Sequence, residues 1–444
     1  MVQIESEVLS SNRYKIYNKR NLYRSIGIKT PAKQFIQIFA TENFLRRKMD
    51  LKKVFVSLLL LFSTVGNSQL PELSPLSKIS VLTCGPGDAL YSTFGHSAFR
   101  VTDDAIGIDV VYNYGVFDFN TDNFYVKFAK GKLDYLLARQ QYSNFMREYE
   151  YDRRWVKEQV LQLTQDERNA LFQFLEHNYL PENRAYPYDF FYNNCATKIW
   201  DVLATVYGNQ LYFDTNFLKE QFTHRELIRQ NMPINSWSAF GIDLALGSVI
   251  DDLATPKEHM FLPKYIMEQL NSSKLGERRL APNEVSLYEP EPLLHESDFL
   301  LTPLFWSLVC MALVFLITFL DYRKNRRSKS VDFALFLSTG IAGILIFFLW
   351  FCTDHTATAN NFNMLWAFPF NVIMAFMVIR RRKPPTWTLK YVQLLLVMLL
   401  AVPILWNMKV QIFSPVTISL LLALATRYTY FLLYNTKQKP ESVV

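Results

Sequence analysis

Two residues, Cys195 and His96, are of types that together could carry nucleophilic chemistry. The stretch YNNCATKIWDVL (192–203) places Cys195 after two asparagines, and the apolar residues that follow recur at helical spacing. We expect Asn193 or Asn194 to cap this helix, so that Cys195 lies in its first turn. Unpaired N–H groups and the positive end of the helix dipole lower a thiol pKa from its free value of about 8.5. A nearby imidazole would lower it further.

His96 belongs to FGHSAFRV (94–101), a segment with strand character in which small residues follow the histidine and leave room beside its ring. A catalytic histidine needs a third residue that accepts the proton of its far ring nitrogen, and the adjacent strand should supply it. Asn113 is the first choice, with Tyr114 or Asp118 in reserve. A structural histidine is the alternative.

The four cysteines leave three interpretations of Cys195 open. Cys310 and Cys352 belong to or border apolar runs, so Cys84 and Cys195 remain together in the segment expected outside the cytoplasm. They could form a disulfide, which would remove the nucleophile. Cys195 could instead be an inert buried thiol, or it could be a nucleophile.

The elements that must position these residues predict an α+β fold. Segments 78–84, 96–101 and 109–115 alternate as paired strands and predict a small antiparallel sheet. Helical patterns follow around 121–129 and 142–151. Another begins after Thr164, where TQDE has the spacing of a capping box.

The C-terminal part reads as a membrane domain. Apolar stretches of nearly membrane-spanning length predict an all-α bundle of about five helices, at 300–320, 332–351, 363–379, 391–407 and 413–434. Basic residues cluster in DYRKNRRSKS and IRRRKPPTWTLK, whereas TDHTATANN has none. The positive-inside rule makes the basic loops cytoplasmic. The formal net charge of +7 therefore indicates membrane orientation, not nucleic-acid binding.

These patterns divide the chain into five parts. Residues 1–48 are a wrongly assigned start or a disordered tail, and 49–68 have the basic start and apolar core of a signal peptide. An extracytoplasmic thiol domain (69–298), a five-helix membrane domain (299–435) and a cytoplasmic tail (436–444) follow. We expect a multi-pass protein of the inner (cytoplasmic) membrane whose catalytic domain faces the periplasm.

The order of these motifs resembles the circularly permuted papain-like superfamily, which includes lecithin:retinol acyltransferases and NlpC-type cell-wall hydrolases. PGD (86–88), a strand histidine, a polar residue on the next strand and NC opening a helix make up that order. In that superfamily the cysteine attacks an acyl carbon and the histidine activates it.

A closer resemblance, to a narrower family, implies which molecule accepts the acyl chain. TCGPGDALYSTFGHSAFRV…YNYGVFDF…PENRAYPYDFFYNNCATKIWD resembles Bacteroidetes envelope proteins with an Lnb-type periplasmic domain, which are implicated in N-acylating lipoproteins. The resemblance covers about 78–265 and extends to TDHTATANNFNMLWAFP. It implies a phospholipid acyl donor and a diacylglyceryl lipoprotein acceptor.

Further residues are candidates for substrate contact. Arg100 lies on the same strand face as His96 and, like Arg184, could hold an anionic head group, although a solvated arginine is the alternative. Tyr114 is a further candidate. Asp354 and His355 lie at the expected outer membrane face, where ionisable residues mark sites or pathways but loops are also ordinarily polar.

The sequence predicts no cofactor and no metal, because the remaining histidines lack metal-ligand spacing with one another. We therefore expect a membrane-bound thiol acyltransferase that forms a Cys195 thioester. The alternatives are an envelope cysteine hydrolase, either a peptidoglycan peptidase or a phospholipase, that uses the same pair, and a non-catalytic envelope binding protein.

Overall fold

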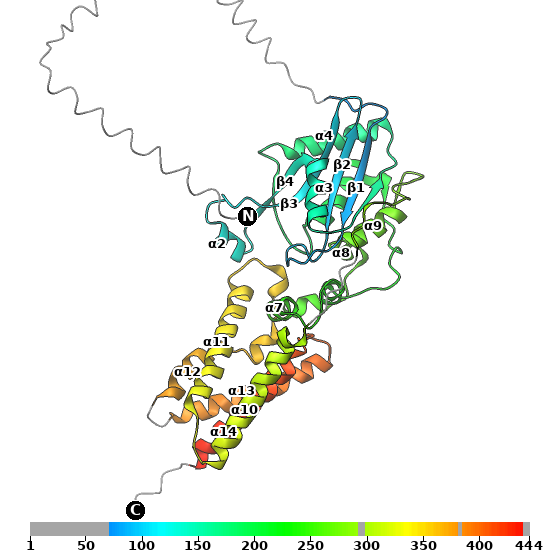
Figure 1. Ribbon diagram of the computed structural model, residues 1–444. Coiled ribbons are helices and arrows are strands. Elements are labelled where there is room, and N and C mark those ends of the chain that lie inside the picture. Colours follow the sequence, from blue (N-terminus) through cyan, green and yellow to red (C-terminus); the bar gives the residue numbers. More distant parts are fainter. Residues whose placement is uncertain (1–70, 292–297, 381–383, 438–444) are drawn as a thin grey trace, which may run out of the picture. The chain divides into compact units, whose positions relative to one another are not determined.

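The computed structural model describes residues 71–291, 298–380 and 384–437, which belong to one compact unit beginning at Pro71. The expected signal peptide, the segment before it and most of the expected C-terminal tail lie outside the described residues. The described part is an α+β domain followed by a set of apolar helices (Figure 1).

An antiparallel seven-stranded sheet forms the centre of the first part. Its order is β10-β5-β1-β2-β3-β4-β6. The three predicted strands are present, but the sheet is larger than expected because polar or very short segments extend both edges. The strands are β1 Lys78–Cys84, β2 His96–Asp103, β3 Ile108–Val116, β4 Asp134–Gln141, β5 Val156–Val160, β6 Ala185–Pro187 and β10 Val285–Tyr288.

Helices cover both faces of this sheet. The helix α3 (Tyr142–Tyr151) packs Phe145 and Tyr149 into one buried cluster with Leu82, Cys84, Ala98 and Val111. The helices α4 (Gln165–Tyr179) and α5 (Cys195–Tyr207) share the larger cluster with the alternate residues of the strands. Successive side chains of a strand point to opposite faces, which explains the division. The predicted capping box of Thr164 and Glu167 is confirmed at the start of α4.

Shorter elements complete this part. Between β3 and β4 lies α2 (Phe124–Ala129), inside the region predicted to be helical. The segments after α5 form a second sheet of three strands, β7 Leu211–Tyr212, β8 Lys274–Leu275 and β9 Arg278–Arg279. They also form the helices α6 His224–Arg229, α7 Trp237–Ala245, α8 Pro256–His259 and α9 Pro263–Ser272.

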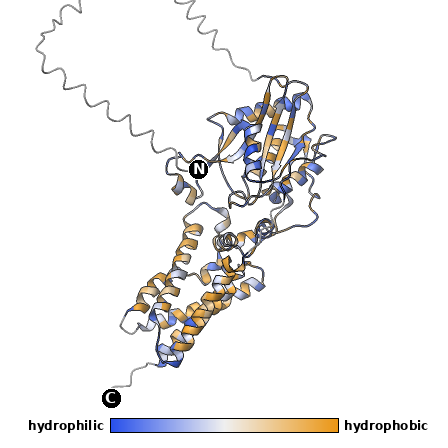
Figure 2. Ribbon diagram, viewed as in Figure 1, coloured by the Kyte–Doolittle hydropathy of each residue, from blue (hydrophilic) through white to orange (hydrophobic). Residues whose placement is uncertain are grey.

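Within the described residues, four helices are long and apolar enough to cross a membrane. Hydrophobic residues dominate them in Figure 2. They are α10 Pro303–Arg323, α11 Lys329–Phe351, α13 Thr386–Asn407 and α14 Val416–Lys437. The remaining predicted span, 363–379, differs: it consists of a 3₁₀ turn, Phe362–Leu365, an irregular stretch and a short helix, α12 Asn371–Ile379.

This interrupted segment nevertheless packs along α11 as far as the N-terminal end of α11, where the basic residues Arg327 and Lys329 lie. The backbone at Ala367 and Phe368 lies against Gly343, and that at Val372 lies against Gly340, where no Cβ would fit. Farther along, Arg327 Nη2 donates to the carbonyl oxygen of Val378 at 2.8 Å. A helix of nine residues is only about 14 Å long, so the irregular stretch provides the rest of the crossing.

Buried amides satisfy polar groups along this segment. Asn371 Nδ2 donates to Thr339 Oγ1 at 2.9 Å, and the Tyr391 hydroxyl donates to Asn371 Oδ1 at 2.6 Å. These bonds give the buried amide of Asn371 the partners that a polar group needs in apolar surroundings. Hydropathy alone could not distinguish this broken crossing from a continuous helix.

A buried ion-pair cluster joins three of the long helices. Arg427 of α14 bonds to Asp321 of α10 at 2.9 Å and to Asp332 of α11 at 2.6 Å. All three side chains are almost fully buried. Ionisable residues within membrane segments are expensive unless they pair in the bundle interior, as these do.

The broken crossing can be tested with topology reporters in full-length and truncated chains. Fusions after Arg327 and after Arg380 should report the same side, because Lys329 Nζ donates to the carbonyl oxygen of Arg380 at 2.6 Å. A fusion after Ala357 should report the opposite side. A reporter at Arg380 that agrees with Ala357 would show that 363–379 returns without crossing.

Candidate active site

Cys195 is the first residue of α5, and Asn194 caps the helix. Asn194 Oδ1 accepts the N–H groups of Ala196 and Thr197, both at 2.9 Å. In return, Thr197 Oγ1 accepts the Asn194 N–H at 2.9 Å, which completes a capping box. The expected cap is thus confirmed at the second asparagine, and the thiol lies at the positive end of the helix dipole.

The amide nitrogen of Asn194 anchors this helix start to two other segments. It donates to the carbonyl oxygens of Phe190 at 2.9 Å and Phe261 at 2.7 Å. The side chain is buried, so these bonds are shielded from water. The position of Cys195 is therefore fixed by bonds that are distant in sequence as well as by its own helix.

His96 opens β2 and bonds to Asn113 of β3, with 2.5 Å between His96 Nε2 and Asn113 Oδ1. Phe99 pairs with Tyr112 across these strands, so the register brings the histidine and the asparagine to diagonal positions on one face. A carbonyl oxygen can only accept, so Nε2 carries the proton. Nδ1 is then the nitrogen available to the thiol.

The electrostatics of the pair favour a thiolate and an imidazolium. Burial opposes ionisation of Cys195, but attraction to His96 and the N–H groups of Ser97 and Ala196 lower its pKa below the ordinary value. Burial likewise opposes a charge on His96, yet the thiol and Asn113 raise the pKa of the ring. The sequence-predicted trio Cys195, His96 and Asn113 therefore meets in space.

Two residues beside the thiol were not identified from the sequence. Gly115 has φ +96°, and a Cβ there would lie 3.5 Å from Cys195 Cβ, in the space next to the nucleophile. The hydroxyl of Tyr186, on β6, lies 4.0 Å from the same point. Among the described residues this buried hydroxyl has no hydrogen-bond partner. Burial and the nearby thiol raise its pKa, so Tyr186 is a neutral donor.

The second cysteine of this domain is a core residue. Cys84 is buried among apolar side chains below the sheet face that α3 covers. Burial raises the pKa of its thiol to about 12. Both Cys84 and Cys195 are free thiols, so the disulfide considered from the sequence is not formed.

Two of the expected substrate contacts already have partners within the protein. Arg100 is paired: Nε and Nη2 bond to Asp109, Nη1 bonds to Glu158 at 3.2 Å, and the guanidinium stacks on Tyr142. These bonds use three of its five N–H groups, and the side chain is only 14% exposed. Tyr114 points into the core at 2% exposure, and its hydroxyl accepts a bond from Asn178 at 2.8 Å.

The other expected contacts lie in loops. Arg184 precedes β6 and is half-buried, and its side chain forms no hydrogen bond or ion pair with any residue that the structure describes. Asp354 and His355 are exposed, and Asp354 pairs with Lys132 at 3.4 Å. A Cβ at Gly131 would lie 3.1 Å from His355 Nδ1. This acidic and imidazole pair therefore contacts the loop after α2.

Metal-ligating groups do not gather in the described ranges: no cluster of three His, Cys, Asp or Glu side chains there could hold a metal ion.

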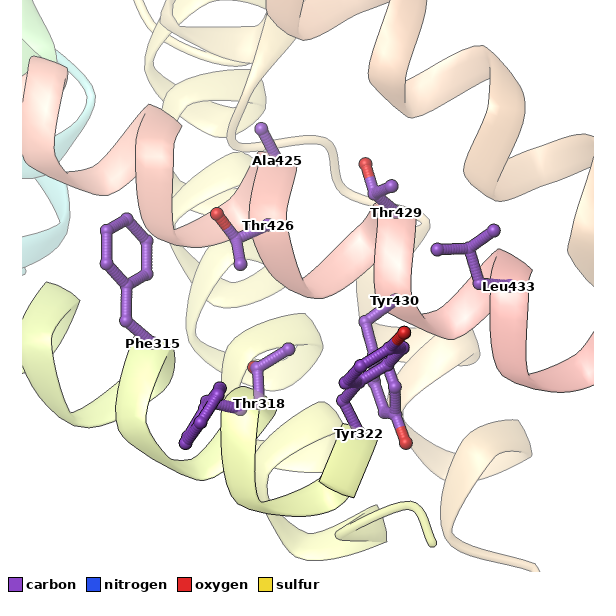
Figure 3. A pocket seen from close by; sticks show the side chains of 9 residues that line it. Phe315, Thr318, Tyr322, Ala425, Thr426, Thr429, Tyr430 and Leu433 are labelled. Atoms are coloured by element: carbon purple, nitrogen blue, oxygen red, sulfur yellow. The ribbon is translucent and has the colours of Figure 1, made fainter. Parts of the chain in front are cut away.

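Two hollows lie outside the trio itself. One, of about 380 Å³, borders Gly95, directly before His96, and is also lined by Cys84, Phe94, Trp155 and Pro263. The other, of about 580 Å³, is a groove between α10 and α14 (Figure 3). Its lining is apolar and hydroxylic, comprising Phe315, Thr318, Phe319, Tyr322, Ala425, Thr426, Thr429, Tyr430 and Leu433. It contains none of the candidate site residues.

Comparison with known families gives two matches. Residues 72–230 match the Lnb N-terminal periplasmic domain, and residues 295–439 match the Lnb transmembrane domain. The first match contains Cys195, His96 and Asn113, and the second contains all the long apolar helices. Comparison with curated proteins and with solved structures found no match.

The thiolate state can be tested by alkylation of the full-length protein with iodoacetamide. The rate at Cys195 should rise with pH around an inflection below the free-thiol value of about 8.5, because its pKa is lowered by His96. His96→Ala should move the inflection upward, since burial is then opposed only by the N–H groups of Ser97 and Ala196.

Peptide mass spectrometry separates the sites, and Cys84 is the internal control. With a pKa of about 12, Cys84 should remain unmodified at neutral pH. An inflection that is identical in the parent protein and in His96→Ala would contradict the pairing.

Proposed function

We propose that this chain, which belongs to the Lnb-type membrane proteins and joins a periplasmic domain to a transmembrane domain, is a cysteine-dependent N-acyltransferase. It would move a fatty acyl chain from a phospholipid to the N-terminal amine of a diacylated lipoprotein. The observation that carries the proposal is the free thiol of Cys195 at a helix start, beside the bonded pair His96 and Asn113. The lipoprotein acceptor rests on the family resemblance.

In the first half-reaction the Cys195 thiolate attacks the ester carbonyl carbon of the phospholipid. The tetrahedral intermediate collapses by breaking the bond to the glycerol oxygen, which leaves as a lysophospholipid. The His96 imidazolium donates its proton to that oxygen. Cys195 then carries the acyl chain as a thioester, and His96 is neutral.

In the second half-reaction the acceptor amine attacks the thioester carbon. Neutral His96 takes a proton from the amine as the carbon–nitrogen bond forms, and the carbon–sulfur bond breaks to return the thiolate. The products are an amide and the starting thiolate–imidazolium pair. Asn113 would hold the ring in the required tautomer throughout.

The oxyanion of both intermediates needs donors aimed at it. The backbone N–H of Cys195 is one, because the first N–H groups of a helix lack intrahelical partners. The hydroxyl of Tyr186 is a second, since it is buried, neutral and without a partner among the described residues. Its charge-neutral state suits it to donate.

The membrane domain supports a transferase over a hydrolase. Both proposed substrates are anchored in a bilayer, so a catalytic domain in the same chain as four membrane-length helices meets both without releasing either. Hydrolysis by the same pair would yield free fatty acid or cleaved peptidoglycan stems. The assay below measures the fatty acid and the amide together.

The central test replaces the nucleophile. Full-length protein in lipid nanodiscs, given a diacylated lipopeptide, should produce triacylated lipopeptide, and Cys195→Ala should lower the rate by at least about 10³-fold. Mass spectrometry of the lipopeptide N-terminus measures it. In cells, loss of the protein should leave lipoproteins with free N-termini.

Cys84→Ala is the matched control, because this core thiol cannot serve the reaction and should leave the rate within a few-fold. Release of fatty acid without any triacylated lipopeptide would favour the hydrolase. Unchanged triacylation in Cys195→Ala would reject the thiol mechanism.

The proposed oxyanion donor can be tested separately. Tyr186→Phe removes only the hydroxyl and should lower kcat by about 10²–10³-fold with little change in the alkylation profile of Cys195. Equal kcat values in the two proteins would exclude the hydroxyl from the reaction.

A further inference from the structure

The segment from Phe117 to Lys132, here called the aromatic tip, exposes an unusual apolar surface. It joins β3 to β4 and contains α2. Tyr125 is 78% exposed, Phe119 68%, and Val126 and Phe128 both 54%. Single exposed apolar residues are ordinary, but four within ten positions of one short connection form a patch that calls for a partner.

The exposed rings are held in place by a buried one. Phe124 is 9% exposed and contacts Phe119 with ring centroids 4.9 Å apart. It also contacts Phe117 at 5.8 Å, Tyr125 at 5.3 Å and Phe128 at 6.3 Å. The exposed surface is therefore a packed cluster and not a set of independent side chains.

The tip also carries three lysines at its C-terminal end, beside two aspartates, Asp118 and Asp122, nearer its start. Lys127 lies in the last turn of α2, and Lys130 and Lys132 follow it directly. Aromatic side chains combined with lysines are typical of segments that lie in the membrane interface, where rings reach the acyl boundary and ammonium groups meet lipid phosphates.

Contacts place the tip beside the end of a membrane helix. The backbone N–H of Asp354 donates to the carbonyl oxygen of Lys130 at 2.9 Å, and Lys132 pairs with Asp354 at 3.4 Å. Asp354 follows closely after Phe351, the last residue of α11, whose ring stacks on Trp350. Such aromatic residues mark the boundary of the hydrocarbon layer.

We propose that the aromatic tip inserts into the periplasmic surface of the bilayer and that its partner is phospholipid. The exposed rings would reach the acyl boundary, and the lysines would bind head-group phosphates. This interaction does not depend on the proposed function, since it requires only that α11 cross the membrane.

If the proposed function holds, the tip also gives the acyl donor a route to the thiol. Behind the tip, Phe117 contacts Tyr135 with centroids 5.5 Å apart, and Tyr135 stacks on Tyr188 at 4.0 Å. Tyr135 also pairs with Tyr186 across β4 and β6, and the Tyr186 hydroxyl lies 4.0 Å from the point at Gly115 that is itself 3.5 Å from Cys195 Cβ. A line of aromatic rings thus runs from the tip toward Cys195.

Photo-crosslinking tests the insertion without reference to activity. p-Benzoylphenylalanine at position 128 of the full-length protein, in membranes, should give phospholipid adducts on irradiation. Tyr151, 89% exposed at the end of α3, is the matched control position and should give none. The same result is expected in Cys195→Ala, which separates this test from that of the acyltransferase. The proposal would be overturned if position 128 formed adducts with protein only. It would also be overturned if the yield of lipid adducts at position 128 did not exceed that at position 151.

A charged residue substituted into the aromatic tip tests whether the tip delivers phospholipid to Cys195. Phe128→Asp should raise KM for vesicle phospholipid at least about fivefold while kcat changes little, because the reacting groups are untouched. Tyr151→Asp should leave both constants unchanged. If position 128 forms lipid adducts but Phe128→Asp leaves KM unchanged, the tip inserts into the bilayer and does not deliver the acyl donor.

Discussion

The hydrogen bonds of Asn194 are the interaction on which the candidate site depends. One side chain caps α5 with its oxygen and ties the helix start to Phe190 and Phe261 with its nitrogen. These bonds hold the thiol of the next residue, Cys195, at the positive end of the helix dipole and at a fixed distance from β2 and β3. Loss of a cap alone costs about 1 kcal/mol, but here the buried nitrogen would also lose its partners. A modest change in stability would therefore be accompanied by displacement of Cys195 from His96.

A second constraint links the periplasmic domain to the membrane helices. Arg225, 1% exposed, bonds to Asp243 and to Asp251, both at 2.7 Å. These bonds fix α6, α7 and the turn that follows. Breaking such a buried pair by removing one partner costs about 3–5 kcal/mol, because a charge is left unpaired.

The anchored end of α7 then meets the membrane part directly. Asn361 Nδ2 donates to the carbonyl oxygens of Leu244 at 2.9 Å and Ala245 at 3.0 Å, and the Gly247 N–H donates to Ala357 at 2.9 Å. The last carbonyls of a helix need such partners. Through these bonds TDHTATANN and its continuation form a docking surface for the periplasmic domain. Its Asp354 and His355 contact protein, so their predicted role in substrate binding stays a proposal.

The sequence predicted those features that depend on local pattern. The start of α5, the capping box of Thr164 and the strands that carry His96 and Asn113 are each encoded within a few residues. It could not reveal pairings that depend on distant segments. Arg100 looked available because its partner Glu158 is 58 residues away. Tyr186 received no role from the sequence, since its nearness to the thiol depends on the pairing of β6 with β4.

The apolar content of 363–379 likewise predicted a membrane segment, but it did not predict that the helix is interrupted. Hydropathy measures whether a segment can enter the hydrocarbon layer, whereas helix continuity depends on what bonds its backbone. At 362–379 some of these bonds come from side chains of other segments: Gln411 accepts the Phe362 N–H, and Arg327 donates to the Val378 carbonyl oxygen, both at 2.8 Å. Pro369 lies where the helix has not yet begun, in keeping with its inability to donate.

The balance between transfer and hydrolysis finally depends on water. A thioester at Cys195 reacts with whichever nucleophile reaches it first, and water is far more concentrated than any lipoprotein amine. The residues near the thiol are Tyr186, Tyr188 and the stacked Tyr135, whose rings occupy space that water would otherwise fill. Gly115 leaves a gap beside these rings, because a Cβ there would lie 3.5 Å from Cys195 Cβ and 4.0 Å from the Tyr186 hydroxyl. In the proposed reaction, rings around the thiol would limit solvent and this gap would leave room for a substrate, which is the condition that a transferase must meet.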